Sequence, residues 1–196
     1  MNELDRLSAL ESDASTAVAA FRRRAAEQGL LDVAYAELDS PLGLLSLFVT
    51  PRGLVRLAYG PAEGELEEIA ERLSPRIVAA PERTDELRRE LQEYFAGERR
   101  GFDAAVDWSL IRGFATAVLQ ATARIPFGAV SSYREIAGEA GSPNAYRAAG
   151  NALGSNPVPI VVPCHRVLHA GGGLGGYTGG LDRKRYLLHL EGVLGK

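Results

Sequence analysis

The hydrophobic positions along the first half of the chain change from helical to strand-like spacing and back. Residues 4–28 place apolar side chains every three or four positions, which predicts an amphipathic helix. Helical spacing returns over residues 63–73 and 83–96, and the polar stretch 97–103 then marks a linker. Between the first two helices, runs of β-forming residues bounded by turn sequences with Pro and Gly predict three strands, at residues 33–38, 44–49 and 54–59.

The second half of the chain is predicted to be mostly helical. Apolar side chains mark one helical face over residues 111–122, and this helix ends before Ile125-Pro126-Phe127-Gly128. Ser132, followed three residues later by Glu135, is the signature of a capping box. It predicts the start of a short helix that ends near Gly141.

A second short helix is expected directly after the first. Ser142-Pro143 supplies an N-cap and a proline at the first helical position, which predicts a helix over residues 143–153. Two short helices joined by a turn that contains Gly141 are typical of a helix-turn-helix. We expect the second helix to expose small side chains that suit close approach either to DNA or to another helix: Ala145, Ala148, Ala149, Gly150 and Ala152.

These elements predict an α+β fold. Its N-terminal α/β domain contains a small antiparallel sheet, and its C-terminal domain is mostly helical and contains the helix-turn-helix. We place an N-terminal helical extension at residues 1–30, the α/β domain at 31–100 and the helical domain at 101–196.

The charge of the chain is unevenly distributed. The net charge of −3 argues weakly against a nucleic-acid partner. Residues 124–196, however, carry eight Lys/Arg and four Asp/Glu, whereas the rest of the chain carries fourteen and twenty-one. The basic part contains the predicted helix-turn-helix, as a phosphate-binding surface requires. Ordinary scatter also produces such an excess, so the charge supports this partner without establishing it.

Cysteine and histidine are scarce. One cysteine and three histidines leave no intramolecular disulfide and no zinc site of the several-cysteine type. No apolar run approaches the length of about 18 residues that spans a membrane, and the first residues are acidic. We therefore expect neither a signal peptide nor a membrane span, and a cytoplasmic location.

The single cysteine lies in the sequence Pro163-Cys164-His165-Arg166-Val167. A thiol reacts as its thiolate, and a neighbouring base or cation raises the thiolate fraction at neutral pH. The preceding run, Asn156–Val162, is apolar and carries two prolines, so we expect a stiff extended segment that fixes the cysteine. Glu191 is a candidate to orient His165. A lone cysteine is also often a small buried hydrophobe, so the spacing alone leaves its role open.

The region around Cys164 resembles the active-site region of the O6-alkylguanine-DNA alkyltransferases, the methylated-DNA–protein-cysteine methyltransferases. The sequences that carry the resemblance are PVPIVVPCHRV and, after it, GGLGGYTGGLDRKRYLLHLEG. The resemblance runs from about Phe114 to Gly192 and, more weakly, back to about Leu31. The PCHR sequence within this setting is highly specific to the family.

The resemblance implies roles for the residues around the thiol. Cys164 would accept the alkyl group, His165 would act as a base through a water molecule, and Glu191 would hold His165. Asn156 would support the turn that presents the cysteine. Tyr133 would hydrogen-bond the flipped guanine and press on the target phosphate.

The resemblance also implies contacts with DNA. Arg147 would be a finger that fills the gap left in the base stack, on a helix that docks in the minor groove. This chain departs from its relatives at Tyr146, because a small residue commonly precedes the finger and a tyrosine is bulky for a narrow groove. The backbones of Cys164, Val167 and Thr178 would read the guanine edge, with Tyr177 beside them. The other expected DNA contacts are Ser132, Ala145 and Ala148.

The implied function is DNA repair. The protein would flip O6-alkylguanine out of duplex DNA and transfer the alkyl group irreversibly to Cys164, once per molecule. O4-alkylthymine is a further candidate substrate, no cofactor or metal is needed, and we expect a monomer. Three alternatives remain: a Cys-His-Glu thiol hydrolase or transferase that turns over repeatedly, a non-enzymatic sensor of alkylation damage, and a redox sensor, which would ordinarily use a second, resolving cysteine.

Overall fold

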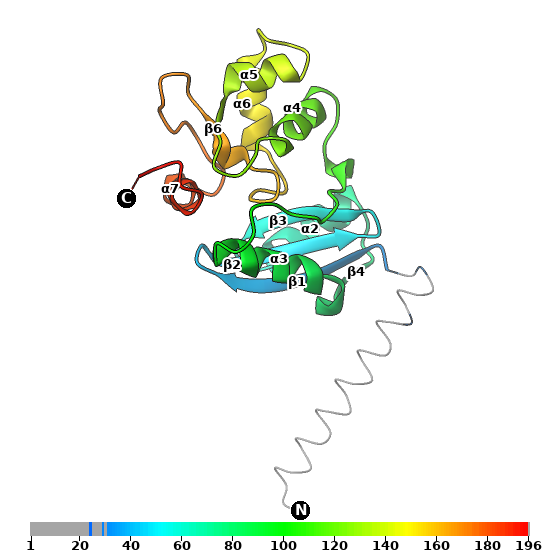
Figure 1. Cartoon of the computed structure of the whole chain (residues 1–196). Coiled ribbons are helices and arrows are strands. Elements are labelled where there is room, and N and C mark those ends of the chain that lie inside the picture. The colour runs from blue at the N-terminus through cyan, green and yellow to red at the C-terminus, as the bar shows by residue number, and fades with distance from the viewer. Residues whose placement is uncertain (1–23, 25–28, 30, 196) are drawn as a thin grey trace, which may run out of the picture.

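The computed structural model describes Arg24, Gly29 and residues 31–195 (Figure 1). The helix predicted over residues 4–28 lies outside the described part of the chain, apart from Arg24. The described residues form an N-terminal half built on a sheet and a mostly helical C-terminal half that lies against it. The predicted α+β fold class is confirmed.

The sheet has four strands in the order β3-β2-β1-β4. β1 (Val33–Ser40), β2 (Gly43–Thr50) and β3 (Gly53–Tyr59) pair in antiparallel fashion, close to the positions predicted from their turn sequences. The fourth strand, β4 (Ile77–Ala79), is parallel to β1 and was not predicted. The sheet is therefore mixed rather than purely antiparallel. A strand of three residues is too short to show a period in the sequence.

Each face of the sheet packs against one helix. Val33 and Phe48 share a cluster with α2 (Glu63–Arg72) on one face. Leu47 points to the opposite face, because successive side chains of a strand alternate, and there it joins a cluster with α3 (Asp85–Phe95). This second cluster continues into the C-terminal half, so the two halves share one hydrophobic core.

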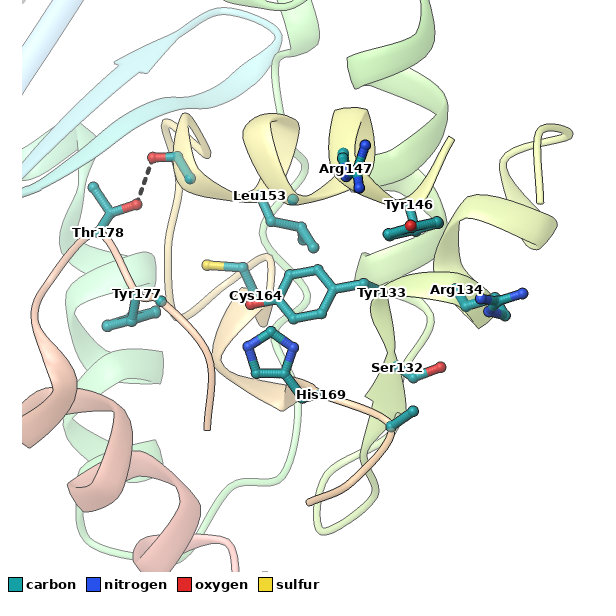
Figure 2. A pocket seen from close by; sticks show the side chains of 14 residues that line it. Ser132, Tyr133, Arg134, Tyr146, Arg147, Leu153, Cys164, His169, Tyr177 and Thr178 are labelled. Carbon is teal, nitrogen blue, oxygen red and sulfur yellow. Dashed lines mark hydrogen bonds between the residues drawn. The ribbon is translucent and has the colours of Figure 1, made fainter. Parts of the chain in front are cut away.

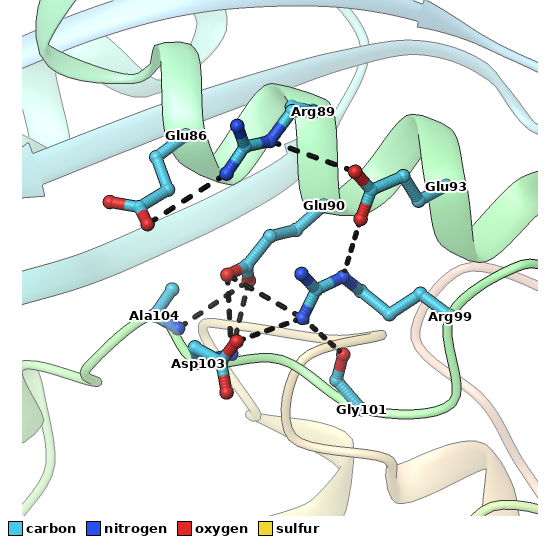
Figure 3. A network of polar contacts seen from close by, with 8 residues as sticks. All are labelled: Glu86, Arg89, Glu90, Glu93, Arg99, Gly101, Asp103 and Ala104. Carbon is cyan, nitrogen blue, oxygen red and sulfur yellow. Dashed lines mark hydrogen bonds and ion pairs between the residues drawn. The ribbon is translucent and has the colours of Figure 1, made fainter.

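A network of charged side chains holds the connection between the halves against α3 (Figure 3). Glu90, which is 1% exposed, accepts hydrogen bonds from the backbone N–H groups of Asp103 and Ala104 at 3.1 and 3.4 Å. Arg99 contacts Glu93 at 2.8 Å and Asp103 at 3.1 Å. The polar stretch that the sequence marked as a linker is thus packed in place.

The C-terminal half contains the predicted helices. α4 (Phe114–Ala123) lies where the apolar spacing placed it, and α5 (Tyr133–Glu139) lies where the capping box placed it. The capping box is also confirmed: Ser132 Oγ accepts from the Glu135 N–H at 3.2 Å, and the Ser132 N–H donates to Glu135 Oε2 at 2.7 Å. The remaining elements are α6 (Tyr146–Gly154), the parallel pair β5 (Ser131–Ser132) and β6 (Val167–Leu168), and α7 (Leu181–Leu190).

The second helix of the predicted helix-turn-helix, α6, begins three residues later than expected. Ser142 and Pro143 belong to a turn instead, in which the N–H of Ala145 donates to the Ser142 carbonyl at 2.9 Å. Tyr146 is the first helical residue. A Ser-Pro pair starts a turn as readily as a helix, and in this structure it starts a turn.

The small residues of α6 lie on two sides of the helix, one buried and one exposed. Ala149 and Ala152 are buried, at 0% and 5% exposed, so the prediction that they are exposed was wrong. They let α6 pack closely within the helical half, where it lies against α4 and α5. Ala148 and Arg147 are exposed. Close helix packing and an accessible surface therefore occur on different sides of the same helix.

The described residues contain neither a membrane-spanning helix nor a cluster of metal ligands. None of their helices is long and apolar enough to cross a bilayer. Within the same residues, no group of three or more His, Cys, Asp and Glu side chains is placed to hold a metal ion.

Candidate active site

The loop before Cys164 is turned rather than extended. Its two prolines keep it out of regular helix and strand, as expected, but the Val162 N–H donates to the Val158 carbonyl at 2.9 Å. Ile160 between them has a φ of 73°, a left-handed conformation that is rare for a β-branched residue, and it is fully buried. The prediction of an extended segment was wrong, because the loop buries its apolar side chains by folding back on itself.

Asn156 holds this loop together. Its Nδ2 donates to the Val162 carbonyl at 2.8 Å and contacts Cys164 Sγ at 3.2 Å, and its Oδ1 accepts from the Val158 N–H at 3.1 Å. Asn156 is 4% exposed, so water competes little for these bonds. It lies where the sequence placed it, beneath the turn that presents the cysteine.

The thiol of Cys164 is buried. The residue begins a short 3-10 helix, Cys164–Arg166, and is 4% exposed. Burial raises the pKa of the Cys164 thiol to about 11, which the hydrogen bond from Asn156 and the charge of Lys184 oppose only in part. The thiol is therefore protonated at neutral pH in this conformation. Attack through sulfur requires a nearby group that takes its proton.

His165 and Glu191 form a buried pair beside the cysteine. His165 Nε2 lies 2.9 Å from Glu191 Oε1, and both side chains are fully buried. Burial alone would raise the pKa of Glu191, but hydrogen bonds from His165 and Arg166 lower it to about 2, so the carboxylate is ionised and only accepts. Burial lowers the pKa of His165, so its ring is neutral at pH 7. The ring proton consequently lies on Nε2, and Nδ1 carries the free lone pair.

Cys164 faces a pocket of about 680 Å³ in the helical half (Figure 2). Tyr133 at the start of α5, Leu153 on α6 and Tyr177 in the glycine-rich segment before α7 form its walls. Small-molecule sites in proteins measure roughly 300–1,000 Å³. The pocket is large enough for a planar group of the size of a nucleobase.

Close packing fixes two tyrosines of this pocket, Tyr133 and Tyr177. The ring of Tyr133 lies 5.2 Å from the ring of His169, and a Cβ at Gly175 would lie 2.5 Å from its hydroxyl oxygen. Gly175 also has a φ of 67°, which favours glycine. The hydroxyl of Tyr177 lies 2.6 Å from that of Tyr59, at the end of β3. The sheet half thus supports one wall of the pocket.

Two arginines and a tyrosine line the mouth of the pocket. The guanidinium groups of Arg134 and Arg147 lie 5.4 and 5.7 Å from the ring centre of Tyr146, within the range of cation–π contacts. Figure 2 shows Tyr146 between them. The ring of Tyr146 remains 38% exposed. Positive charge at this mouth favours an anionic partner such as a phosphate backbone.

Comparison with known proteins gives a family. A model of the 6-O-methylguanine DNA methyltransferase DNA binding domain matches residues 113–193, and a model of the ribonuclease-like domain of the same enzyme matches residues 33–108. The methylated-DNA–protein-cysteine methyltransferase of Mycolicibacterium paratuberculosis is 43% identical over 166 residues, which are 81% of this chain and 92% of that relative. The chain belongs to the methylated-DNA–protein-cysteine methyltransferase family.

Solved structures of methyltransferases have the same fold. Mycobacterium tuberculosis OGT in complex with DNA is 40% identical with a TM-score of 0.68, over 81% of this chain and 92% of that one. An archaeal O6-methylguanine-DNA methyltransferase from Pyrococcus kodakaraensis is 23% identical with a TM-score of 0.56, over 82% and 99%, and shows the fold alone. The chain is a DNA repair protein that transfers an alkyl group to a cysteine, and this interpretation is favoured over a thiol hydrolase and a damage sensor.

The methyltransferase fold brings most of the predicted site residues together. Those that line the pocket are Ser132, Tyr133, Tyr146, Arg147, Cys164, Tyr177 and Thr178. Those that do not line it but are buried around the cysteine are Asn156, His165 and Glu191. Three predicted contacts lie outside the pocket lining: Ala145 and Ala148 beside Tyr146 and Arg147, and Val167, which is fully buried.

A buried lysine beside the methyltransferase site was missed by sequence reasoning. Lys184 is fully buried, and its Nζ donates to the Val167 carbonyl at 2.7 Å. Burial lowers the pKa of Lys184 to about 8, and the proximity of Cys164 opposes this shift. Lys184 lies in the polar sequence Asp182–Arg185, which resembles a solvated helix face, so the sequence held no sign of its burial.

Two hydrogen-bond partners of the Glu191 carboxylate were also missed. Arg166 donates to both oxygens of Glu191 at 2.8 Å, and the hydroxyl of Tyr94 donates to Oε1 at 2.6 Å. The position of Arg166 directly after His165 was a usable signal. Tyr94 lies 97 positions before Glu191, on a helix of the other half, and nothing in its local sequence points there.

Tyr146→Ala is expected to change the affinity for duplex DNA by less than about tenfold, or roughly 1.4 kcal/mol, with thermal stability largely kept. The ring lies at the surface against two exposed arginines and lines an open pocket, so its loss opens no cavity in the core. Titration of a labelled duplex and thermal melting test this. A large fall in Tm would place Tyr146 in the core, and a larger change in affinity at unchanged Tm would place it within the groove.

Proposed function

We propose that this methyltransferase repairs duplex DNA by taking the alkyl group of O6-alkylguanine onto Sγ of Cys164. The observation that carries the proposal is the only cysteine of the chain at the wall of a nucleobase-sized pocket, beside the buried His165–Glu191 pair. An alkyl group on O6 is hidden within the base stack. The nucleotide therefore rotates out of the duplex to bring that group to the thiol.

His165 takes the proton of the thiol. Its Nδ1 is buried, carries the free lone pair and has no hydrogen-bond partner among the described residues, which suits it to accept a proton relayed by a water molecule. Glu191 stabilises the imidazolium that results. The charge of Lys184 and the Nδ2 group of Asn156 both favour the thiolate form of Cys164.

The transfer itself is a single displacement. The thiolate attacks the alkyl carbon, the bond from that carbon to O6 breaks, and its electron pair stays on the guanine. Tyr133 donates a hydrogen bond to the leaving base. Burial and the nearby Cys164 raise the pKa of Tyr133, so its hydroxyl stays neutral and able to donate. A thioether is not reversed by thiols, so each molecule reacts once, without a cofactor.

The DNA docks on α5 and α6, in the minor groove. Arg147 at the mouth of the pocket fills the gap that the flipped nucleotide leaves, and Arg134 beside it contacts the phosphate backbone. The exposed side of α6 carries Ala148, whose small side chain allows close approach. The backbones of Cys164, Val167 and Thr178 read the guanine edge. The protein acts as a cytoplasmic monomer, and O4-alkylthymine is its second substrate.

Intact mass spectrometry tests this proposal. The protein is mixed with a duplex that contains one O6-methylguanine, and we expect a gain of one methyl group, which peptide analysis locates on Cys164. A duplex with O4-methylthymine tests the second substrate, and an unmodified duplex is the control. A protein whose mass does not change with the O6-methylguanine duplex would overturn the proposed function.

Arg147→Ala is expected to slow reaction with the alkylated duplex much more than reaction with free O6-benzylguanine, because only the duplex leaves a gap in its base stack to be filled. Single-turnover rates with the two substrates measure this difference. Arg89→Ala is the charge-matched control, since Arg89 is exposed on α3 in the sheet half. Equal losses on both substrates would give Arg147 a structural role instead.

A further inference from the structure

One hydroxyl group of the sheet half contacts the carboxylate that holds His165. Tyr94 on α3 is fully buried, and its hydroxyl donates to Glu191 Oε1 at 2.6 Å. We propose that Tyr94 is a positioning residue for alkyl transfer, which acts on His165 through Glu191. The inference rests on the proposed function, in which His165 takes the proton of Cys164.

Arg166 and Tyr94 bind the carboxylate of Glu191 in different ways. Arg166 binds both oxygens of the carboxylate and so sets the plane of the group. Oε1, the oxygen that binds His165 Nε2 at 2.9 Å, also receives the hydroxyl of Tyr94. Arg166 also binds this oxygen, but among its described partners Tyr94 alone comes from the sheet half, and it adds a second restraint on the oxygen that orients the imidazole.

The hydroxyl of Tyr94 keeps its proton and so can always donate to Glu191. Burial, together with the charge of Glu191, raises the pKa of Tyr94, so the phenol stays protonated in neutral solution. Its ring packs 5.2 Å from that of Phe102 and 6.1 Å from that of Phe127, centre to centre. The ring is therefore held by the connection between the halves and by the helical half of the protein. Its shape and its hydroxyl serve different purposes, and a substitution can separate them.

Tyr94→Phe removes the hydroxyl and keeps the ring. We expect the maximal single-turnover rate at saturating O6-methylguanine duplex to fall about tenfold, as for loss of a hydrogen bond to a charged group. The duplex concentration that gives half of this rate should not change, because Tyr94 is fully buried and does not line the pocket. Tyr186→Phe is the matched control: its ring belongs to the same aromatic cluster, 6.5 Å from Phe95, and we expect a wild-type rate.

A double-mutant cycle tests whether Tyr94 acts through Glu191. In the Glu191→Gln background, Tyr94→Phe should cause little further slowing. A wild-type rate for Tyr94→Phe, or the full tenfold loss in both backgrounds, would overturn the inference while leaving the proposed function in place. A wild-type protein that gains no methyl group on Cys164 would overturn the proposed function and the inference with it. The melting temperatures of all variants establish that the compared proteins are folded.

Discussion

Cys164→Ser is expected to accept no methyl group from an O6-methylguanine duplex and still to bind that duplex. A hydroxyl is far less nucleophilic than a thiol at neutral pH, and its proton is much harder to remove, so the His165–Glu191 pair would form far less of the anion from serine than from cysteine. Serine is similar in size to cysteine, and Asn156 can donate to its oxygen, so the loop and the DNA-binding surface should stay intact. Intact mass spectrometry measures the transfer, and titration of a labelled duplex measures the binding.

The wild-type protein in the same assays is the control for Cys164→Ser. Methyl transfer by the serine variant would remove Cys164 from the mechanism. Loss of duplex binding at an unchanged melting temperature would instead show that the thiol contributes to docking. The prediction therefore separates the chemistry of the sulfur from the shape of the site.

His165→Gln and Glu191→Gln are each expected to slow transfer by roughly 10²–10⁴-fold, the usual contribution of a general base, without a matching loss of DNA affinity. Glutamine at position 165 cannot take the thiol proton, and without the carboxylate of Glu191 the imidazole loses the partner that holds its proton on Nε2. The wild-type rate should also fall as the pH drops below the lowered pKa of His165, because the protonated ring cannot accept. Single-turnover rates across pH measure both effects.

Glu191→Gln carries a cost in stability that His165→Gln does not. It leaves the guanidinium of Arg166 buried without its anion, and breaking a buried pair costs about 3–5 kcal/mol. Rates are therefore compared below the melting temperature of the least stable variant, and His165→Gln is the cleaner test. Rates near wild type for both variants would exclude the His165–Glu191 pair from the mechanism.

Much of the fold was accessible from local sequence. Helices α2 to α4 were placed because burial of one side gives each a period in its hydrophobic positions. The three antiparallel strands were placed from runs of β-forming residues between turn sequences. The capping box at Ser132 was recognised because both partners lie within one turn. The short strand β4 was not predicted, because three residues show no period. The late start of α6 was not predicted either, because Ser142-Pro143 suits a turn as well as a helix.

The sequence by itself determined which residues are candidates for the chemistry of the site. The Pro163–Val167 motif supplied a candidate nucleophile and a neighbouring candidate base. Glu191 was a candidate to orient that base, and the resemblance to the methyltransferases implies the same role for it. What the sequence could not supply is how the motif is presented. The conformation of the loop before Cys164 depends on which apolar side chains it buries, and the raised pKa of the thiol depends on that burial.

Only the tertiary structure decided which distant groups complete the site. The Tyr94 hydroxyl reaches Glu191 across 97 positions, and the Tyr59 hydroxyl reaches Tyr177 across 118. A hydrophobic period shows that a residue such as Tyr94 is buried, but not what its polar atom meets. That partner depends on how α3 packs between the sheet and the helical half, and this packing places a hydroxyl of one half on the carboxylate of the other.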